Sequence, residues 1–167
     1  PLLTRYLAEV PAGALMEGAD SYGEPRVDIA VAPILKGGNT VGWAFVTSDF
    51  VGTTGYSGKP IHVLVAIGTD AILKGVKLVK HSEPIVLVGI PEAKVKALTE
   101  AYKGMDLTAE AKAGGSAHDL KIISGATVTV MVIDDSVVRS SLRVARALGL
   151  GGLKSPTASV GPTVKLN

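Results

Sequence analysis

SGATVTVMVIDDSVVRSSLRVARALG, residues 124–149, is the stretch that decides how this 167-residue chain is arranged. Residues 128–133 favour a strand by propensity, whereas the residues beyond them recur at helical spacing. Because the helical pattern covers more of the stretch, we predict a long amphipathic helix that ends at Gly149. Its apolar stripe consists of Val130, Ile133, Val137, Val144 and Leu148, widened by Val138, Leu142 and Ala145.

The turn before this helix predicts an anion site. A helix that starts beside Thr127 leaves its first backbone N–H groups free at the positive end of the helix dipole. Gly125 lets a ligand approach the backbone closely, and Ser124 and Thr127 each place a hydroxyl next to it. A phosphate suits such a site. The alternative is that one of the two hydroxyls only caps the helix.

Upstream of this turn, alternating apolar residues predict two β-hairpins. The first turns at Gly37-Gly38 and the second near residues 68–70, and the strands of the second hairpin have one face in water. Sequential hairpins pair antiparallel, so we expect an α+β fold with a curled, mainly antiparallel sheet and helices on one side of it. The alternating residues are Ile29, Val31, Val41, Trp43, Phe45, Ile61, Val63, Val65, Ile67, Val76 and Leu78.

Two shorter helices complete the predicted pattern. Apolar residues at helical spacing indicate one in the first ten residues, and another extends from Pro91 to a stop at Gly104. A loop at residues 114–116 then leads into a short strand over residues 120–123. We expect residues 1–150 to form one domain and residues 151–167 a linker or tail.

Composition excludes several classes of function. The 17 basic and 15 acidic side chains nearly balance, and the basic residues do not cluster with aromatic residues, which argues against nucleic acid as a partner. There is no cysteine, so thiolate metal sites and disulfides are absent. His62, His81 and His118 lie far apart in the sequence, and we predict surface or strand histidines rather than metal ligands.

Two motifs resemble those of a known family. Ser124-Gly125-Ala126-Thr127, followed by Val128-Thr129 and an amphipathic helix, resembles the flavinylation motif of the FMN-binding domains of NqrC, RnfG and NosR proteins. The stretch GYSGKPI (residues 55–61) and the strands after it are similar to paired strands of that family. HSEPIV (residues 81–86) is similar to the NosR branch. The resemblance covers roughly Ala30 to Leu148.

The resemblance implies a covalent cofactor. In the family, the threonine after Gly-Ala is joined to the phosphate of FMN by a phosphoester that an ApbE-type flavin transferase installs, which assigns the attachment to Thr127. The flavin ring then lies against the segments around Tyr56 and Glu83. No catalytic or metal-binding residue is implied. The implied cofactor-binding residues are Thr127, Ser124, Gly125, Ala126, Val128, Thr129, Tyr56, Ser57, Glu83, Pro84 and Ile85.

The resemblance also implies a role. We expect an electron-transfer domain rather than a self-contained enzyme, located in the periplasm as the soluble part of a membrane-anchored respiratory protein of NosR type. Such a protein supports nitrous oxide reduction. The implied partners are the ApbE-type flavin transferase, the remainder of the membrane-anchored chain and, as redox partner, nitrous oxide reductase.

Alternative functions stay open at this point. The family motif commonly has an aspartate three residues before the serine, and this chain has Lys121 there. That departure motivates a second hypothesis, a flavin-optional regulatory or assembly module that acts through a protein partner. A third hypothesis, an acyl- or phosphoryl-transfer enzyme that uses Ser124, lacks a base placed by any motif.

Overall fold

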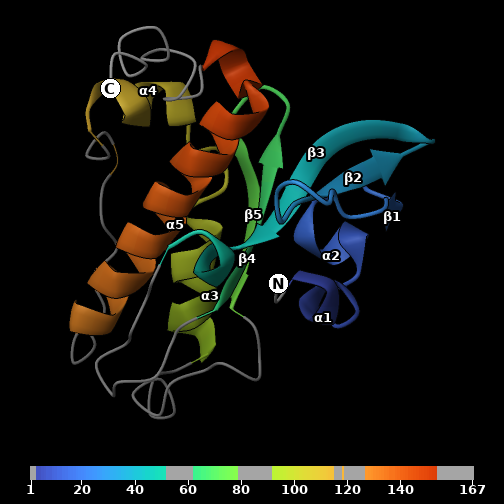
Figure 1. Cartoon of the computed structure of the whole chain (residues 1–167). Coiled ribbons are helices and arrows are strands. Elements are labelled where there is room, and N and C mark those ends of the chain that lie inside the picture. The colour runs from blue at the N-terminus through green and yellow to red at the C-terminus, as the bar shows by residue number, and fades with distance from the viewer. Residues whose placement is uncertain (1–2, 52–61, 79–91, 115–117, 119–126, 154–167) are drawn as a thin grey trace, which may run out of the picture.

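An open antiparallel sheet forms the centre of the computed structural model, which describes residues 3–51, 62–78, 92–114, 118 and 127–153 (Figure 1). Its five strands follow one another in space in their sequence order, so β1 and β5 are the two edges. The strands are β1 Ser21–Tyr22, β2 Ala32–Lys36, β3 Asn39–Val46, β4 Val63–Gly68 and β5 Leu73–Leu78.

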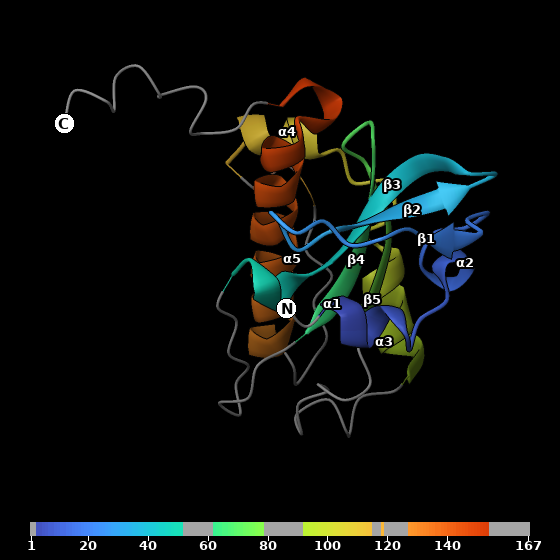
Figure 2. The ribbon, with the colours of Figure 1, turned by 45° about the vertical axis from the view of Figure 1, so that its right-hand side comes forward.

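Helices cover both faces of this sheet. Figures 1 and 2 show the long helix α5 on one side of β4 and β5, and the two short N-terminal helices on the other. No helix in the described ranges combines the length and apolar character needed to cross a bilayer. The helices are α1 Leu3–Leu7, α2 Ala12–Leu15, α3 Glu92–Glu100, α4 Leu107–Lys112 and α5 Thr127–Leu148, with single 3-10 turns η1 Thr47–Asp49 and η4 Leu150–Gly152.

The predicted α+β class, the antiparallel sheet and the C-terminal helix are confirmed, but the prediction of helices on one side is wrong. All six residues of β4 are buried. Val63, Val65 and Ile67 belong to the core under α3, α4 and α5, whereas Leu64 and Ala66 belong to a second core under α1 and α2. The run VLVAIG contains no polar side chain that could face water. The prediction of one face in water rested on the alternation of β-branched residues and is wrong for β4.

The first hairpin has the predicted turn, but its first strand begins later in the sequence than predicted. Gly37 and Gly38 have φ angles of 58° and 81°, the left-handed pair that a two-residue hairpin turn requires. The first strand of this hairpin, β2, begins at Ala32, three residues after the predicted alternation starts at Ile29. The amide of Val31 donates to the carbonyl of Ile29 at 2.7 Å, and this tight turn interrupts the extended chain before the strand.

Residues that favour helix termini lie at or near several ends of the described helices. Gly149, with a φ angle of 69°, directly follows the last residue of α5, whereas α3 ends at Glu100 and Gly104, with a φ angle of 87°, closes the turns after it. The helix α4 was not predicted. Its signal is Asp106, whose carboxylate accepts from the amide of Thr108 at 2.9 Å as an N-cap. The strand predicted over residues 120–123 lies outside the described residues.

A close backbone contact joins α2 to the edge strand. A Cβ atom on Gly75 would lie 1.7 Å from the carbonyl oxygen of Leu15, so only glycine permits this approach. The side chain of Leu15 is itself 1% exposed, in the core under α1 and α2. The contact therefore fixes where α2 covers the sheet.

We expect Gly75→Ala to lower the free energy of unfolding by about 2 kcal/mol, because α2 must move off the sheet to admit the methyl group. Urea unfolding followed by circular dichroism measures the change. Thr40→Ala, at an exposed position of β3, is the control and should stay within about 0.5 kcal/mol. A Gly75→Ala variant as stable as the control would contradict this account of the contact.

Candidate functional site

The first turn of α5 is the described part of the candidate site. The helix begins at Thr127 and continues for 22 residues, as the sequence predicted. Thr127, Val128 and Thr129 are described by their backbone alone. The other predicted cofactor-binding residues lie outside the described residues: Ser124, Gly125, Ala126, Tyr56, Ser57, Glu83, Pro84 and Ile85.

The chain segments that carry those residues nevertheless join the described fold at one end. Figures 1 and 2 both place the beginnings of α5, α3 and β4 and the end of β5 at the same end of the molecule. The register agrees, because Val63 at the start of β4 pairs with Leu78 at the end of β5. Residues 52–61, 79–91 and 119–126 therefore all connect to this end.

Burial holds α5 in place behind its first turn. Val130, Ile133 and Val137 are at most 1% exposed and pack in the core against the sheet. Ser136 and Ser140 are fully buried as well, and their hydroxyls donate to carbonyls one turn back in the helix, at 2.9 Å to Val132 and at 2.5 Å to Ser136. Small side chains with internal partners let the helix pack closely without leaving polar groups unsatisfied.

The second half of α5 is tied to the segment after β3. Arg143 donates from Nη1 to the carbonyl oxygen of Phe50, and η1 contacts the helix along this side. The amide of Val63 donates to Oγ1 of the buried Thr47 in η1 at 3.2 Å. One short segment thus connects α5 with the start of β4, near the end of the molecule where the site lies.

A cluster of four polar side chains, here called the His118 cluster, joins the turn after α3 to α4 and α5. His118 contacts Oε1 of Glu110 through Nδ1 at 2.8 Å and Oδ1 of Asp134 through Nε2 at 2.7 Å. The hydroxyl of Tyr102 donates to the same oxygen of Asp134 at 2.8 Å. Glu110 is 2% exposed and Tyr102 is 3% exposed, so the cluster is largely removed from water.

Both ring nitrogens of His118 face carboxylate oxygens, and both can donate only when the ring is protonated. Partial burial lowers the pKa of His118, but the hydrogen bonds to Asp134 and Glu110 and the charges of these carboxylates outweigh burial and raise the pKa above its ordinary value. Burial, then the charge of Asp134 and its hydrogen bond, raise the pKa of Tyr102, so its hydroxyl stays a donor. The sequence prediction of a surface or strand histidine missed this role, since no spacing marks it.

The His118 cluster fixes one end of the segment that leads to Thr127. Asp134 lies seven residues into α5, about 10 Å from Thr127 along the helix axis. Residues 119–126 therefore connect His118, which contacts α5, to Thr127, the first residue of α5.

His62 has a different environment at the start of β4. Its Nδ1 lies 2.5 Å from Oγ of Ser48, and its ring lies 5.8 Å from the ring of Tyr6. Burial lowers the pKa of His62, although the charge of Asp49 opposes this. His62 is therefore neutral at pH 7, whereas the carboxylates around His118 favour its charged form.

We expect His118→Gln to lower the free energy of unfolding by about 3 kcal/mol at pH 5.5, because it removes the cation that lies between the carboxylates of Glu110 and Asp134. The folded-state pKa of His118 is raised, so its stabilisation is complete below about pH 6.5, the unfolded value, and is lost as the pH rises through the folded value. The difference between wild type and variant should therefore shrink towards high pH. Urea unfolding over a pH series measures it.

Asp135→Asn is the matched control, since Asp135 is the neighbouring carboxylate of α5 and pairs with Arg139 at the exposed surface. Its effect should stay below about 1 kcal/mol. A His118→Gln effect that does not change with pH would contradict the charged cluster.

Comparison with known proteins agrees with the motif resemblance. The chain matches the FMN-binding domain family over residues 55–140. The Regulatory protein NosR of Pseudomonas aeruginosa is 39% identical over 135 residues, 78% of this chain and 19% of that protein. The Protein NirI of Paracoccus denitrificans is 39% identical over 119 residues, 71% of this chain and 17% of that protein.

A second NosR, from Stutzerimonas stutzeri, is 36% identical over 127 residues, 74% of this chain and 18% of that protein. The chain thus spans less than a fifth of the length of each of these curated relatives. The family match includes β4, β5, α3, α4 and the first two-thirds of α5, with Thr127 inside it. This chain belongs to the FMN-binding domain family and is related to the NosR and NirI proteins.

Proposed function

We propose that this domain carries FMN covalently, through a phosphoester to Oγ1 of Thr127, and transfers electrons within a larger membrane-anchored protein of NosR type. The observation that supports the proposal is the start of α5. A helix of 22 residues begins at the residue that the flavinylation motif assigns, and this residue lies within the family match.

The start of α5 fits a phosphate group. The first N–H groups of a helix have no partner within the helix, and the helix dipole adds a partial positive charge. The backbone amides of Thr127, Val128 and Thr129 are the donors that this turn offers. An anion at such an end is stabilised by about 0.3–1 kcal/mol, and a covalent bond makes the retention of the cofactor independent of this modest affinity.

The fold supplies a fixed support for the cofactor. When bound, FMN supplies reversible electron uptake, and the protein positions it and sets its surroundings. Val130 and Ile133, on the turns that follow Thr127, are at most 1% exposed in the core, so the attachment point cannot move without disturbing the sheet. We expect the segments around Tyr56 and Glu83 to contact the flavin ring.

We further propose the setting in which the domain works. The relatives are named NosR and NirI, and the chain spans less than a fifth of each. We place the domain in the periplasm, as a part of an inner-membrane respiratory protein that supports nitrous oxide reduction. An ApbE-type flavin transferase loads it, the rest of its own chain exchanges electrons with it, and nitrous oxide reductase is the proposed redox partner.

Intact mass spectrometry tests the attachment. Protein exported together with a flavin transferase should carry an added mass equal to FMN less one water, and Thr127→Val should remove it, because valine has the shape of threonine without the hydroxyl. Thr40→Val, on β3, is the matched control and should keep the adduct. If the Thr127→Val protein still carries the adduct, the flavin is attached elsewhere.

Two observations favour a second function. Two of the relatives are named regulatory proteins, and Lys121 occupies the position where the flavinylation motif commonly has aspartate. The domain would then act through a protein partner, with the flavin optional. The two functions make opposite predictions for the hydroxyl of Thr127.

Nitrous oxide consumption by cells that carry Thr127→Val in the full-length protein separates the two functions. A flavin carrier loses its support of nitrous oxide reduction, because electrons no longer pass through the domain. A flavin-optional regulator keeps it. Immunoblotting of the variant protein shows that it accumulates normally, so that a loss of activity is not caused by degradation.

A further inference from the structure

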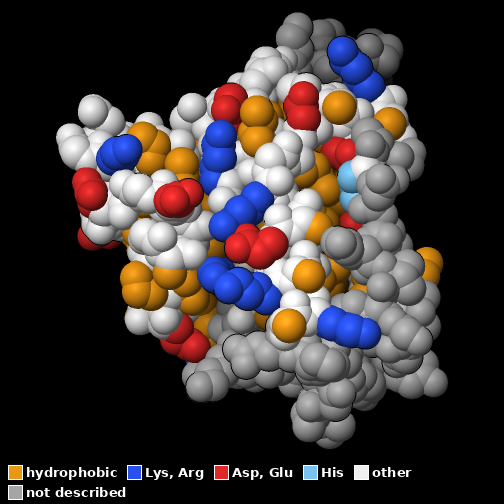
Figure 3. Space-filling model, turned by 180° about the vertical axis from the view of Figure 1, so that it is seen from behind, with side chains coloured by type: hydrophobic (Ala, Val, Ile, Leu, Met, Phe, Trp, Pro, Cys, Tyr) orange, Lys and Arg blue, Asp and Glu red, His pale blue; other side chains and the backbone are white. Residues whose placement is uncertain are grey.

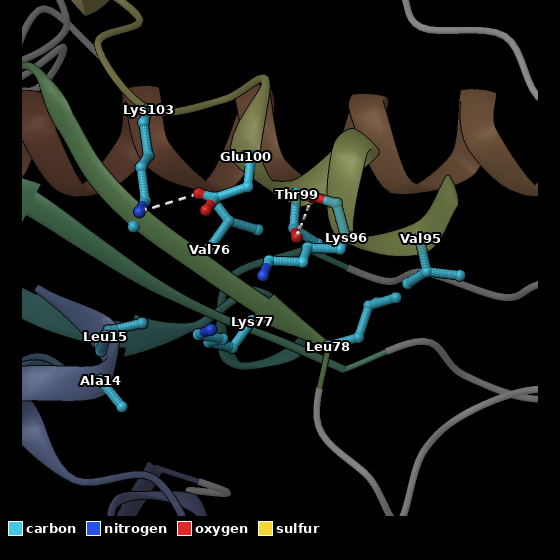
Figure 4. Close-up of a pocket in the computed structure, with 11 residues that line it drawn as sticks. Ala14, Leu15, Val76, Lys77, Leu78, Val95, Lys96, Thr99, Glu100 and Lys103 are labelled. Carbon is cyan, nitrogen blue, oxygen red and sulfur yellow. Dashed lines mark hydrogen bonds and ion pairs between the residues drawn. The ribbon is translucent and has the colours of Figure 1, made fainter. Parts of the chain in front are cut away.

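A groove with lysine side chains around it runs along the open edge of the sheet, on the face shown in Figure 3. Its floor is the edge strand β5 from Gly75 to Leu78, and its volume is about 250 Å³. Ala14 and Leu15 of α2 border one side and α3 borders the other. Figure 4 shows the strand between the two helices, with side chains of both borders around it. We call it the edge groove.

The backbone of β5 is covered at its start and open along the edge groove. At Leu73 the amide donates to Met105 and the carbonyl accepts from Gly104, at 3.0 and 2.8 Å. Within the part of the chain that the structure describes, no such partner lies on the outer side of residues 75–78. Unpaired groups at the edge of a sheet are the template on which a further strand forms.

The charges around the edge groove are predominantly positive. Lys77, Lys96 and Lys103 line it, with Glu100 as the carboxylate among the described lining residues. Glu100 pairs with Lys103 at 2.8 Å. The pKa of Glu100 is lowered by this hydrogen bond and by the charges of Lys103, Lys77 and Lys96. The positive charges of all three lysines therefore reach the carboxylate of Glu100.

The lysines lie on both sides of the strand. Val76 and Leu78 pack towards α3 and α5, so alternation directs Lys77 to the opposite face, which α2 covers. Lys96 lies on α3, and Lys103 lies in the turn that follows it. A strand added to β5 would direct alternate side chains to these two sides, and each side offers ammonium groups.

We propose that the edge groove binds an extended acidic segment of a partner protein, which adds to β5 as a further strand. The open backbone edge supplies main-chain hydrogen bonds, and the lysines select carboxylates on both faces of the added strand. The groove is concave and backed by strand backbone, which favours a peptide over a flat anionic surface. This binding does not depend on the flavin.

The edge groove also extends towards the proposed flavin site. It ends at Leu78, the residue that pairs with Val63 at the end of the molecule where α5 begins. A partner anchored along β5 is thereby held beside that end. Docking and electron transfer would use neighbouring surfaces, without sharing residues.

The test uses the whole domain and a labelled seven-residue probe, acetyl-Glu-Val-Glu-Val-Glu-Val-Glu-amide, at low ionic strength. Fluorescence anisotropy measures affinity, and NMR spectra of the amides locate the binding. We expect shifts at residues 75–78 and in α3, and a loss of affinity of about tenfold in the double variant Lys77→Glu, Lys96→Glu. The control is the double variant Lys36→Glu, Lys74→Glu, which changes the net charge equally but outside the groove lining. It should change the affinity less than about twofold.

A second probe separates strand addition from charge attraction. The same peptide with N-methyl groups on alternate amides keeps its carboxylates and cannot pair with β5. It should bind at least about tenfold more weakly than the unmodified peptide. Equal binding of the two probes, equal losses in the two double variants, or no binding of the unmodified probe would each overturn the proposal.

Discussion

The burial of β4 between two helical layers is the constraint on which the rest of the structure depends. Val63, Val65 and Ile67 on one face and Leu64 and Ala66 on the other are all inaccessible to solvent. The valine, leucine and isoleucine side chains among them each contribute about 1.5–3 kcal/mol when fully buried. These contacts bring α5 onto the sheet, and the position of Thr127 follows from the core and not from the turn that precedes it.

Two features keep the first turns of α5 oriented on this core. The apolar stripe packs against the sheet, and on the same face, one turn from Val130 and Val138, Asp134 of the His118 cluster connects the helix to α4 and to the turn after α3. The apolar contacts are non-directional, whereas the hydrogen bonds of His118 and Tyr102 to Asp134 fix the rotation of the helix. A helix end that is fixed in both position and rotation presents its free amides in one direction. Such a turn suits a cofactor whose ring must lie in a defined place.

Much of this arrangement could be predicted from the sequence, because its signals are local. The stripe of α5, the glycine pair at residues 37–38 and the stop at Gly149 each depend on residues close together in the chain, and each prediction was confirmed. The Thr127 assignment came from a motif and stays a prediction, as do the contacts of Tyr56 and Glu83. The family itself was confirmed by comparison.

The features that the sequence did not reveal depend on contacts between distant segments. Whether β4 has one buried face or two depends on α1 and α2, which lie more than 45 residues before it. The role of His118 depends on Glu110 and Asp134, whose spacing matches no motif. The helix α4 is short, and its N-cap Asp106 was the one local signal for it.

The complete covering of β4 also has a consequence for the chain before it folds. Val63–Gly68 is a six-residue run with high β-propensity, no charge and no proline, the composition that favours self-association into cross-β aggregates. In the native domain one face of this run is shielded by helices that follow it in the sequence, so that face stays exposed until α5 has been synthesised. A newly made chain therefore needs rapid folding, or a chaperone that shields this run, to stay free of aggregates.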